Sequence, residues 1–184
     1  DGILCLTIKY NGDEISIVSE GKIKNFNEKA VSLTEDKKGR IWVSTEFNGI
    51  FLLNLLKNKN EESSYKITHF SINDGLPSSY VSSYKIKNKI IFISTNGIYF
   101  PEEIPNNKPK EIRFVKQSDF LSNLLCKYVN INNIKEDESE NIWIQLSHKG
   151  TNIKVTMLLQ HQKDNSYKLV TIPFKPIPQM EMYA

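Results

Sequence analysis

The chain has 184 residues, of which 39% are hydrophobic and 24% charged, a composition that is ordinary for one soluble folded domain with a substantial core. Its 24 Lys and Arg residues against 21 Asp and Glu residues leave a net charge of +3, which is too small and too scattered to indicate nucleic acid binding. No apolar run approaches the roughly 20 residues that a membrane helix needs, and no signal peptide is expected in these residues, so any leader would lie outside the chain.

The first 27 residues predict part of a β-sheet. Asp1-Gly2 is typical of a turn, and strands are expected at Ile3–Ile8, Glu14–Ser19 and Lys22–Phe26. In a four-stranded unit, with A the innermost strand and D the outermost, these three would be B, C and D.

Residues 28–72 predict a complete four-stranded unit around Trp42. Alternation of apolar and polar side chains over residues 40–45 is the pattern of a strand with two unlike faces. Asp36 and Gly39 provide a tight turn before that strand, and Asn48-Gly49 predicts a hairpin after it. The expected strands A to D are Lys29–Asp36, Arg40–Thr45, Gly49–Leu56 and Tyr65–Phe70.

The same order recurs twice more, in residues 73–117 and 118–174. The second unit has expected strands at Tyr80–Lys87, Ile90–Thr95, Gly97–Phe100 and Lys110–Lys116. The third has expected strands at Tyr128–Asp137, Asn141–Ser147, Asn152–Leu159 and Tyr167–Phe174. Residues 175–184 would then begin a further unit with a lone A strand.

The spacing of the aromatic anchors indicates a repeat. Trp42, Phe92 and Trp143 are 50 and 51 residues apart, and short strands at this period are typical of an all-β propeller with four-stranded antiparallel blades. The strands amount to about four blades. Either the last strand closes onto the first three, or residues 1–184 are an arc of a larger propeller, which we favour.

Residues Glu35–Phe51 resemble the two-component regulator propeller repeat. That family has an acidic residue and Asp, a short turn with Gly, then Ile-Trp-(Ile/Val)-Gly-Thr and Gly-(Leu/Ile)-aromatic, and this chain has Ser44 at the usual Gly. Residues 70–81, with Asp-Gly-Leu-Pro-Ser at their centre, are similar to the family's crossing between blades. The unit around Phe92 departs from the pattern by lacking the Asp-Gly turn, and the unit around Trp143 lacks Ser-Thr.

This resemblance implies a function. The family supplies the extracytoplasmic sensor region of histidine kinases, often hybrid ones, in which propellers precede a sandwich domain and a membrane helix. The implied partners are a small-molecule or oligosaccharide ligand, such as a glycan or nutrient, the other propeller and sandwich domains, and a second receptor copy in a homodimer. The implied location is the periplasmic or extracellular part of a membrane-anchored receptor.

Two other functions stay open. A propeller hydrolase or lyase would show His and carboxylate side chains clustered at the channel mouth, since fold alone does not decide function. A protein-binding scaffold propeller would show a large apolar patch on one face.

No catalytic, cofactor-binding or metal-binding pattern is expected in this segment. The three histidines, His69, His148 and His161, lack metal-ligand spacing. The paired carboxylates Glu35-Asp36 and Glu136-Asp137 recur at one repeat position, so we expect them to serve the turns. Two cysteines, Cys5 and Cys126, are interpreted as buried free thiols, although a disulfide would form in an oxidising compartment if they met.

A ligand would meet the crossings from strand D to the next A and the turns between B and C, which share one face of a propeller. Tyr and Asn suit sugar stacking and hydroxyl hydrogen bonds, and Lys suits an acidic sugar or sulfate. Each residue taken singly could equally be a solvated loop residue. The candidates are Lys29, Ser79, Tyr80, Lys127 and Tyr128 from the crossings, and Asn48, Asn96, His148 and Lys149 from the turns.

Overall fold

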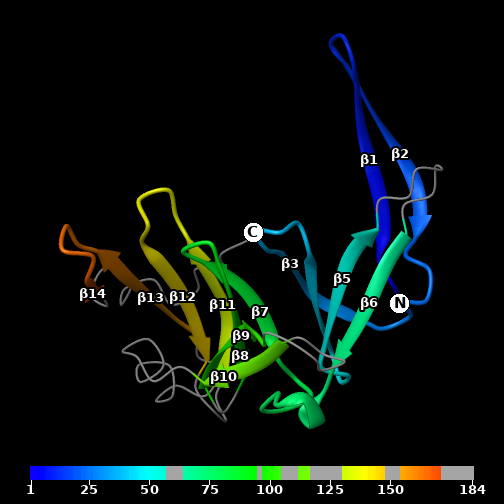
Figure 1. Ribbon diagram of the computed structural model, residues 1–184. Coiled ribbons are helices and arrows are strands. Elements are labelled where there is room, and N and C mark those ends of the chain that lie inside the picture. The colour runs from blue at the N-terminus through cyan, green and yellow to red at the C-terminus, as the bar shows by residue number, and fades with distance from the viewer. Residues whose placement is uncertain (57–63, 95–96, 105–111, 117–129, 148–153, 171–184) are drawn as a thin grey trace. The chain divides into compact units, whose positions relative to one another are not determined.

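The computed structural model describes residues 1–56, 64–94, 97–104, 112–116, 130–147 and 154–170. The chain divides into two compact units, Asp1–Ser82 and Ser83–Ala184 (Figure 1). Within the described ranges almost all regular structure is β-strand, and the helical content is the 3-10 turn η1 at Ile72–Asp74.

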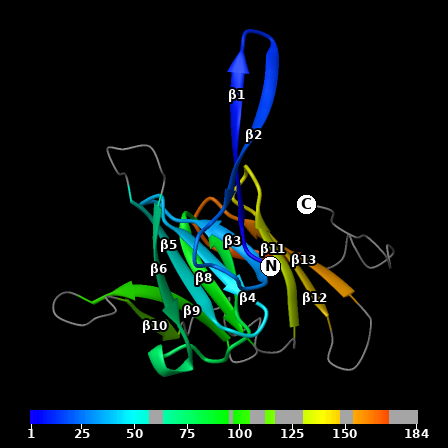
Figure 2. The same cartoon turned by 90° about the vertical axis from the view of Figure 1, so that its right-hand side faces the viewer.

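The first unit contains a two-stranded hairpin and a four-stranded sheet. The hairpin extends beyond the sheet (Figures 1 and 2). The sheet is antiparallel throughout, with its strands in chain order. The hairpin strands are β1 (Leu4–Asn11) and β2 (Glu14–Lys22), and those of the sheet are β3 (Ala30–Glu35), β4 (Ile41–Thr45), β5 (Ile50–Leu56) and β6 (Ser64–Phe70).

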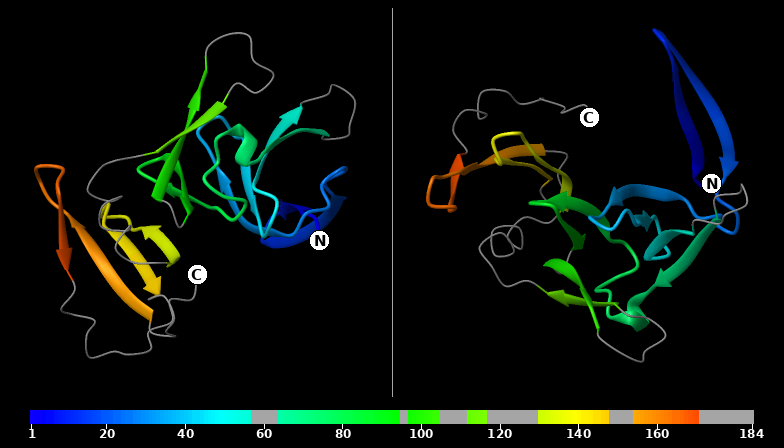
Figure 3. Two further views of the ribbon diagram at one scale, coloured as in Figure 1. Left: turned by 90° about the horizontal axis from the view of Figure 1, so that it is seen from below. Right: turned by 45° about the horizontal axis from the view of Figure 1, so that its top comes forward.

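The second unit contains two four-stranded sheets, each again with its strands in chain order (Figure 3). The first has β7 (Ser82–Ile86), β8 (Lys89–Ser94), β9 (Gly97–Glu103) and β10 (Ile112–Lys116). The second has β11 (Asn130–Glu136), β12 (Ile142–Ser147), β13 (Lys154–His161) and β14 (Tyr167–Val170). The prediction of an all-β chain with four-stranded antiparallel sheets of the propeller-blade type is therefore confirmed. The lone A strand expected within residues 175–184 lies outside the described residues.

The strand expected at Lys22–Phe26 is wrong. After β2 the chain turns, with the Phe26 N–H donating to the Ile23 carbonyl at 3.4 Å. Asn25 has a positive φ angle of 63°, which an extended strand rarely adopts. Ile23 and Phe26, which are three positions apart, are buried as anchors of this turn and not as alternate residues of a strand.

Strand β9 continues to Glu103, past Phe100, where the expected strand ended. Pro101 lies opposite Phe114 of β10. The neighbouring strand β8 pairs with β9 only over residues 97–99. The missing N–H of Pro101 therefore breaks no ladder hydrogen bond on that side.

Each unit has its own apolar core. In the first, Val43 and Leu53 of the sheet pack with Ile23 and Phe26, which follow the hairpin. In the second, buried side chains of both sheets form one cluster, including Ile91 of β8 and Ile144 of β12. The aromatic anchors Trp42 and Phe92 are fully buried.

A carboxylate at the start of the repeat holds the first anchor in place. Asp36 accepts hydrogen bonds from the indole Nε1–H of Trp42 at 3.0 Å and from the Arg40 Nε–H at 2.7 Å. It also accepts from the backbone N–H groups of Lys38 and Arg40. One side chain therefore closes the turn and gives a buried indole its partner.

The third repeat has the same arrangement around Asp137. Its carboxylate accepts hydrogen bonds from the indole N–H of Trp143 at 2.8 Å, from the side chain of Asn141 and from the backbone N–H groups of Ser139 and Asn141. Glu140 has a φ of 62° in this turn and occupies the place of Gly39, whose φ is 72°. Asp36 and Asp137 thus serve their turns, as their recurrence predicted, whereas Glu136 bonds to a turn of the adjacent sheet.

The turn before the aromatic anchor is stabilised differently in the middle repeat. The position six residues before Phe92 is Ile86, and a phenyl ring has no N–H to satisfy. The turn is shortened to Lys87 and Asn88, both with positive φ. Its Lys87 N–H donates at 2.7 Å to the carboxylate of Glu136, which belongs to the adjacent sheet of the same unit.

Replacing Asp36 by Ala should lower the free energy of unfolding by about 2 kcal/mol, because the buried Trp42 N–H and the turn amides lose their acceptor. Asp137→Ala should cost less, since Trp143 is only partly buried. Urea unfolding monitored by tryptophan fluorescence measures both. Asp36→Asn keeps one acceptor oxygen, so its free energy of unfolding should lie between those of the wild type and Asp36→Ala. If Asp36→Ala is destabilised no more than Asp36→Asn, the assigned role is contradicted.

Acidification should remove part of this stability. Burial would raise the pKa of Asp36, but hydrogen bonds from Arg40, Trp42 and the turn amides outweigh it and hold the pKa below its ordinary value of 3.8. The Trp143 hydrogen bond lowers the pKa of Asp137 against an opposing effect of burial. A carboxylate with a lowered folded-state pKa stabilises the fold above its unfolded-state pKa and stops doing so as the pH falls through the folded value.

The wild-type chain should therefore lose stability below about pH 4. A double variant with Asp36→Asn and Asp137→Asn should lose less over the same range, because these two groups no longer titrate. Denaturant unfolding between pH 7 and pH 2 measures the difference. Parallel curves for the two proteins would show that neither carboxylate contributes to acid sensitivity.

Candidate functional site

The turn between β4 and β5 forms one end of the first sheet. Thr45 closes it by donating to the Gly49 carbonyl through both its N–H and its hydroxyl, each at 3.0 Å. The same hydroxyl accepts from the Asn48 N–H at 3.0 Å. Phe47 and Asn48 are exposed at the tip of this rigid turn.

The crossing that leaves β6 packs against this turn. It begins with η1, which Ser71 and Asp74 cap reciprocally. The Gly49 N–H donates to the Ser79 carbonyl at 2.9 Å. A Cβ on Gly49 would clash with the carbonyl oxygen of Phe70, at the end of β6 from which the crossing starts, so only glycine allows the turn to approach this closely.

The segment before β3 also reaches this turn. The Lys29 ammonium is 2.7 Å from the Glu46 carboxylate, and the Glu46 N–H donates to the Lys29 carbonyl at 3.1 Å. The amide of Asn48 donates to Glu28 at 2.9 Å. His69, a residue of β6, contacts the same turn. Its Nε2 lies 2.8 Å from the Asn48 carbonyl oxygen, and its ring stacks on that of Phe51.

The structure brings four of the nine predicted ligand-binding residues together here. They are Lys29, Asn48, Ser79 and Tyr80, and we call them with Phe47 the turn–crossing surface. Ser79 contributes its backbone carbonyl to the packing, and the Tyr80 side chain is 57% exposed. The other five, Asn96, Lys127, Tyr128, His148 and Lys149, lie outside the described residues.

Sequence reasoning missed Phe47. Its side chain is 78% exposed, although phenylalanine is among the residues most often buried in proteins. An aromatic residue directly before the Asn-Gly pair of a predicted turn was the available signal. Trp42, in contrast, is fully buried and hydrogen-bonded, so it is not available to stack on a ligand.

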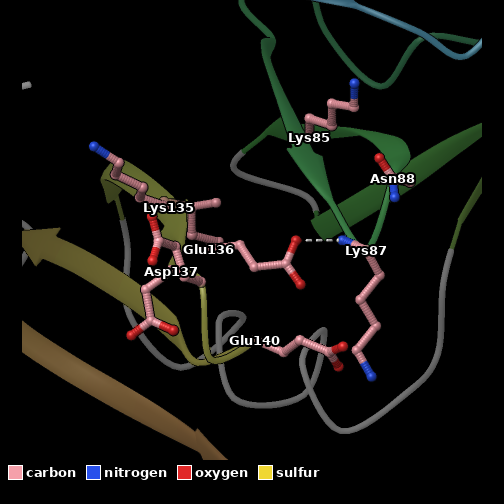
Figure 4. A pocket seen from close by; sticks show the side chains of 9 residues that line it. Lys85, Lys87, Asn88, Lys135, Glu136, Asp137 and Glu140 are labelled. Carbon is pink, nitrogen blue, oxygen red and sulfur yellow. Dashed lines mark hydrogen bonds between the residues drawn. The ribbon is translucent and has the colours of Figure 1, made fainter.

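A hollow lies in the second unit, beside the turns that follow β7 and β11 (Figure 4). It has a volume of about 720 Å³ and contains charges of both signs. Glu136 points across it to the Lys87 N–H, and the Lys87 ammonium lies 4.7 Å from the centre of the Tyr167 ring. These contacts connect the two sheets, and the sequence did not predict this hollow.

The described residues contain no group of three or more His, Cys, Asp or Glu side chains placed to hold a metal ion. In the part of the chain that the structure describes, no helix has the length and apolarity needed to cross a membrane.

The sheets define the chain as an all-β repeat protein of the propeller type. Comparison with protein-family models matches residues 26–47 to the family described as two component regulator propeller. This match confirms the family predicted from the resemblance of Glu35–Phe51. The matched family is a regulator propeller and not an enzyme family. Comparisons with curated proteins and with solved structures gave no match.

Substituting Gly49 tests how tightly the turn and the crossing are joined. Gly49→Ala should lower the free energy of unfolding by at least about 2 kcal/mol, because it adds a clash with the Phe70 carbonyl to the strain of a φ of 68°. Gly12 is a matched control, with a φ of 63° and open space within 4 Å of the position that a Cβ would take. Gly12→Ala should cost about 1 kcal/mol or less, and equal losses at the two sites in urea unfolding would contradict the close packing.

Proposed function

We propose that this chain is the ligand-sensing propeller segment of a two-component sensor histidine kinase, and that its ligand is a glycan or another nutrient. The observation that carries the proposal is the matched regulator repeat, residues 26–47, which ends at the turn–crossing surface. The repeat family supports a sensor role, and the geometry of the surface supports a recognition site on a rigid scaffold.

The turn–crossing surface has the chemistry that carbohydrates require. Phe47 and Tyr80 expose aromatic rings that can cover the apolar C–H face of a sugar. Asn48 and Lys29 place an amide and an ammonium close to Phe47, where they can bind hydroxyl or acidic groups. The hydrogen bonds beneath the turn hold these groups in place before binding, which reduces the entropy that binding costs.

The resemblance to the family supports the remaining parts of the proposal. The segment would lie in the periplasmic or extracellular part of a membrane-anchored receptor, beside further propeller and sandwich domains. Receptors would pair as homodimers, and ligand binding would change the arrangement of the pair. This segment itself would perform no reaction.

A thermal-shift screen of glycans and nutrients against the full extracellular region tests the proposal. A true ligand at about 100 times its dissociation constant should stabilise the protein by about 2.7 kcal/mol. Tyr80→Ala and Phe47→Ala should weaken binding at least tenfold without changing the unfolding temperature of the free protein. Tyr10→Ala is the matched control, since Tyr10 is an exposed aromatic residue of the β1–β2 hairpin.

Two outcomes would contradict the proposal. A panel of neutral and acidic glycans and nutrients that produces no shift would exclude the ligand class. A ligand whose affinity falls as much in Tyr10→Ala as in Tyr80→Ala would place recognition away from the turn–crossing surface.

A further inference from the structure

Two Asn-Gly pairs lie in tight turns that the structure describes. Asn48-Gly49 belongs to the turn between β4 and β5, and Asn11-Gly12 belongs to the turn between β1 and β2. The two glycines have nearly the same backbone conformation, with φ angles of 68° and 63°. Asparagine is one of the thermally labile residues of proteins, and a glycine after it places no side chain in the way of its deamidation.

Deamidation of such a pair proceeds through a cyclic imide. The backbone nitrogen of the glycine loses its proton and attacks the side-chain carbon Cγ of the asparagine. A new C–N bond closes the ring, the Cγ–Nδ2 bond breaks, and Nδ2 leaves as ammonia. Water then opens the ring at either carbonyl carbon, which gives aspartate or isoaspartate. The net change is the uptake of water and the release of ammonia.

At Asn48 both reacting groups are held in hydrogen bonds. The nucleophile would be the backbone nitrogen of Gly49, whose N–H points to the Ser79 carbonyl at 2.9 Å. The side-chain amide of Asn48 donates to the Glu28 carboxylate at 2.9 Å. Ring closure would break both hydrogen bonds, so the reaction requires the turn to open first.

The backbone of Asn48 is restrained as well. Its N–H donates to the Thr45 hydroxyl at 3.0 Å, and its carbonyl oxygen lies 2.8 Å from Nε2 of His69. Closing the imide ring rotates both the backbone and the side chain of the asparagine. These contacts resist that rotation.

The charge of Glu28 opposes both the reaction and its product. Attack on Cγ develops negative charge on the side-chain oxygen of Asn48, close to the Glu28 carboxylate that accepts from the same amide. Deamidation would then replace the amide donor with a second carboxylate. Two like charges at this distance repel, so the folded turn disfavours an aspartate at this position.

Asn11 has none of these restraints on its reacting groups. Gly12 and Asp13 form the two-residue turn between Asn11 and Glu14, and both Asn11 and Gly12 are exposed. Among the described residues, neither the Asn11 side chain nor the Gly12 N–H has a hydrogen-bond partner. The nucleophile and Cγ can therefore meet without breaking a hydrogen bond of either group.

We propose that Asn11-Gly12 is a site at which the folded chain deamidates, and that the contacts of the β4–β5 turn protect Asn48-Gly49 from the same reaction. The protection preserves an uncharged amide in the turn–crossing surface, bonded to Glu28. The proposal concerns covalent stability and does not depend on the proposed sensing function. A failed ligand screen leaves it untouched, and its failure leaves ligand binding untouched.

Peptide mapping by mass spectrometry of the 184-residue chain, aged in mildly alkaline buffer, tests the proposal. Cleavage after Lys and Arg releases Asn11 in residues 10–22 and Asn48 in residues 41–57, so each is measured separately. In the folded chain Asn11 should deamidate at least about tenfold faster than Asn48. In guanidinium chloride the two rates should become similar. Equal rates in the folded chain would overturn the proposal, and so would a difference that persists in denaturant, since it would come from local sequence.

Glu28→Ala tests the side-chain contact. Without this acceptor, Asn48 of the folded chain should deamidate at least about threefold faster, while Asn11 keeps its rate. Glu20→Ala is the matched control, because Glu20 is an exposed residue of β2, and it should change neither rate. An unchanged Asn48 rate in Glu28→Ala would overturn the protective role of that contact. If Glu28→Ala fails to fold by circular dichroism, the comparison of folded and denatured wild-type chain decides.

Asn48→Asp tests the effect of the product charge. This variant should have a lower unfolding temperature than the wild type, because its new carboxylate meets that of Glu28. Adding Glu28→Gln should restore most of the loss, since an amide again faces a carboxylate. A loss that Glu28→Gln does not relieve would overturn the assigned role of the Glu28 charge.

Discussion

The hydrogen bond between the Asp36 carboxylate and the Trp42 indole is the constraint on which the complete repeat depends. A fully buried tryptophan needs an acceptor for its N–H, and the same carboxylate ties down the turn that leads into β4. Burial of the anchor and closure of the turn are thus one event. The same group of contacts at Asp137 and Trp143 shows that this is a property of the repeat and not an accident of one loop.

The middle repeat shows the consequence of a different anchor. The Phe92 ring has no N–H group that needs an acceptor. An aspartate before this anchor is therefore not required, and the turn can be shorter. The shortened turn then takes its partner from outside, through the bond from Lys87 to Glu136. An interaction that is local in two repeats has become a contact between neighbouring sheets.

Alternation of side chains predicted the strands of the complete sheets to within a few residues, because a strand with one buried face records its burial in local sequence. The strand prediction failed at Lys22–Phe26, where Ile23 and Phe26 are apolar because they anchor a turn in the core. The candidate site was predicted in outline from the turn signal Asn48-Gly49. Its contacts were not, because the bond from Gly49 to Ser79 joins residues that are 30 positions apart.

The sequence by itself determined the repeat and its period, since the aromatic anchors recur at a nearly fixed spacing. It also determined the aspartates that serve the turns before Trp42 and Trp143, since each lies in the same short stretch as its turn. Only the tertiary structure decided that Lys29 reaches Glu46 and that Glu136 supports the turn of another sheet. Contacts between residues that are far apart in the sequence depend on which surfaces meet when the chain folds. A local sequence pattern contains no information about them.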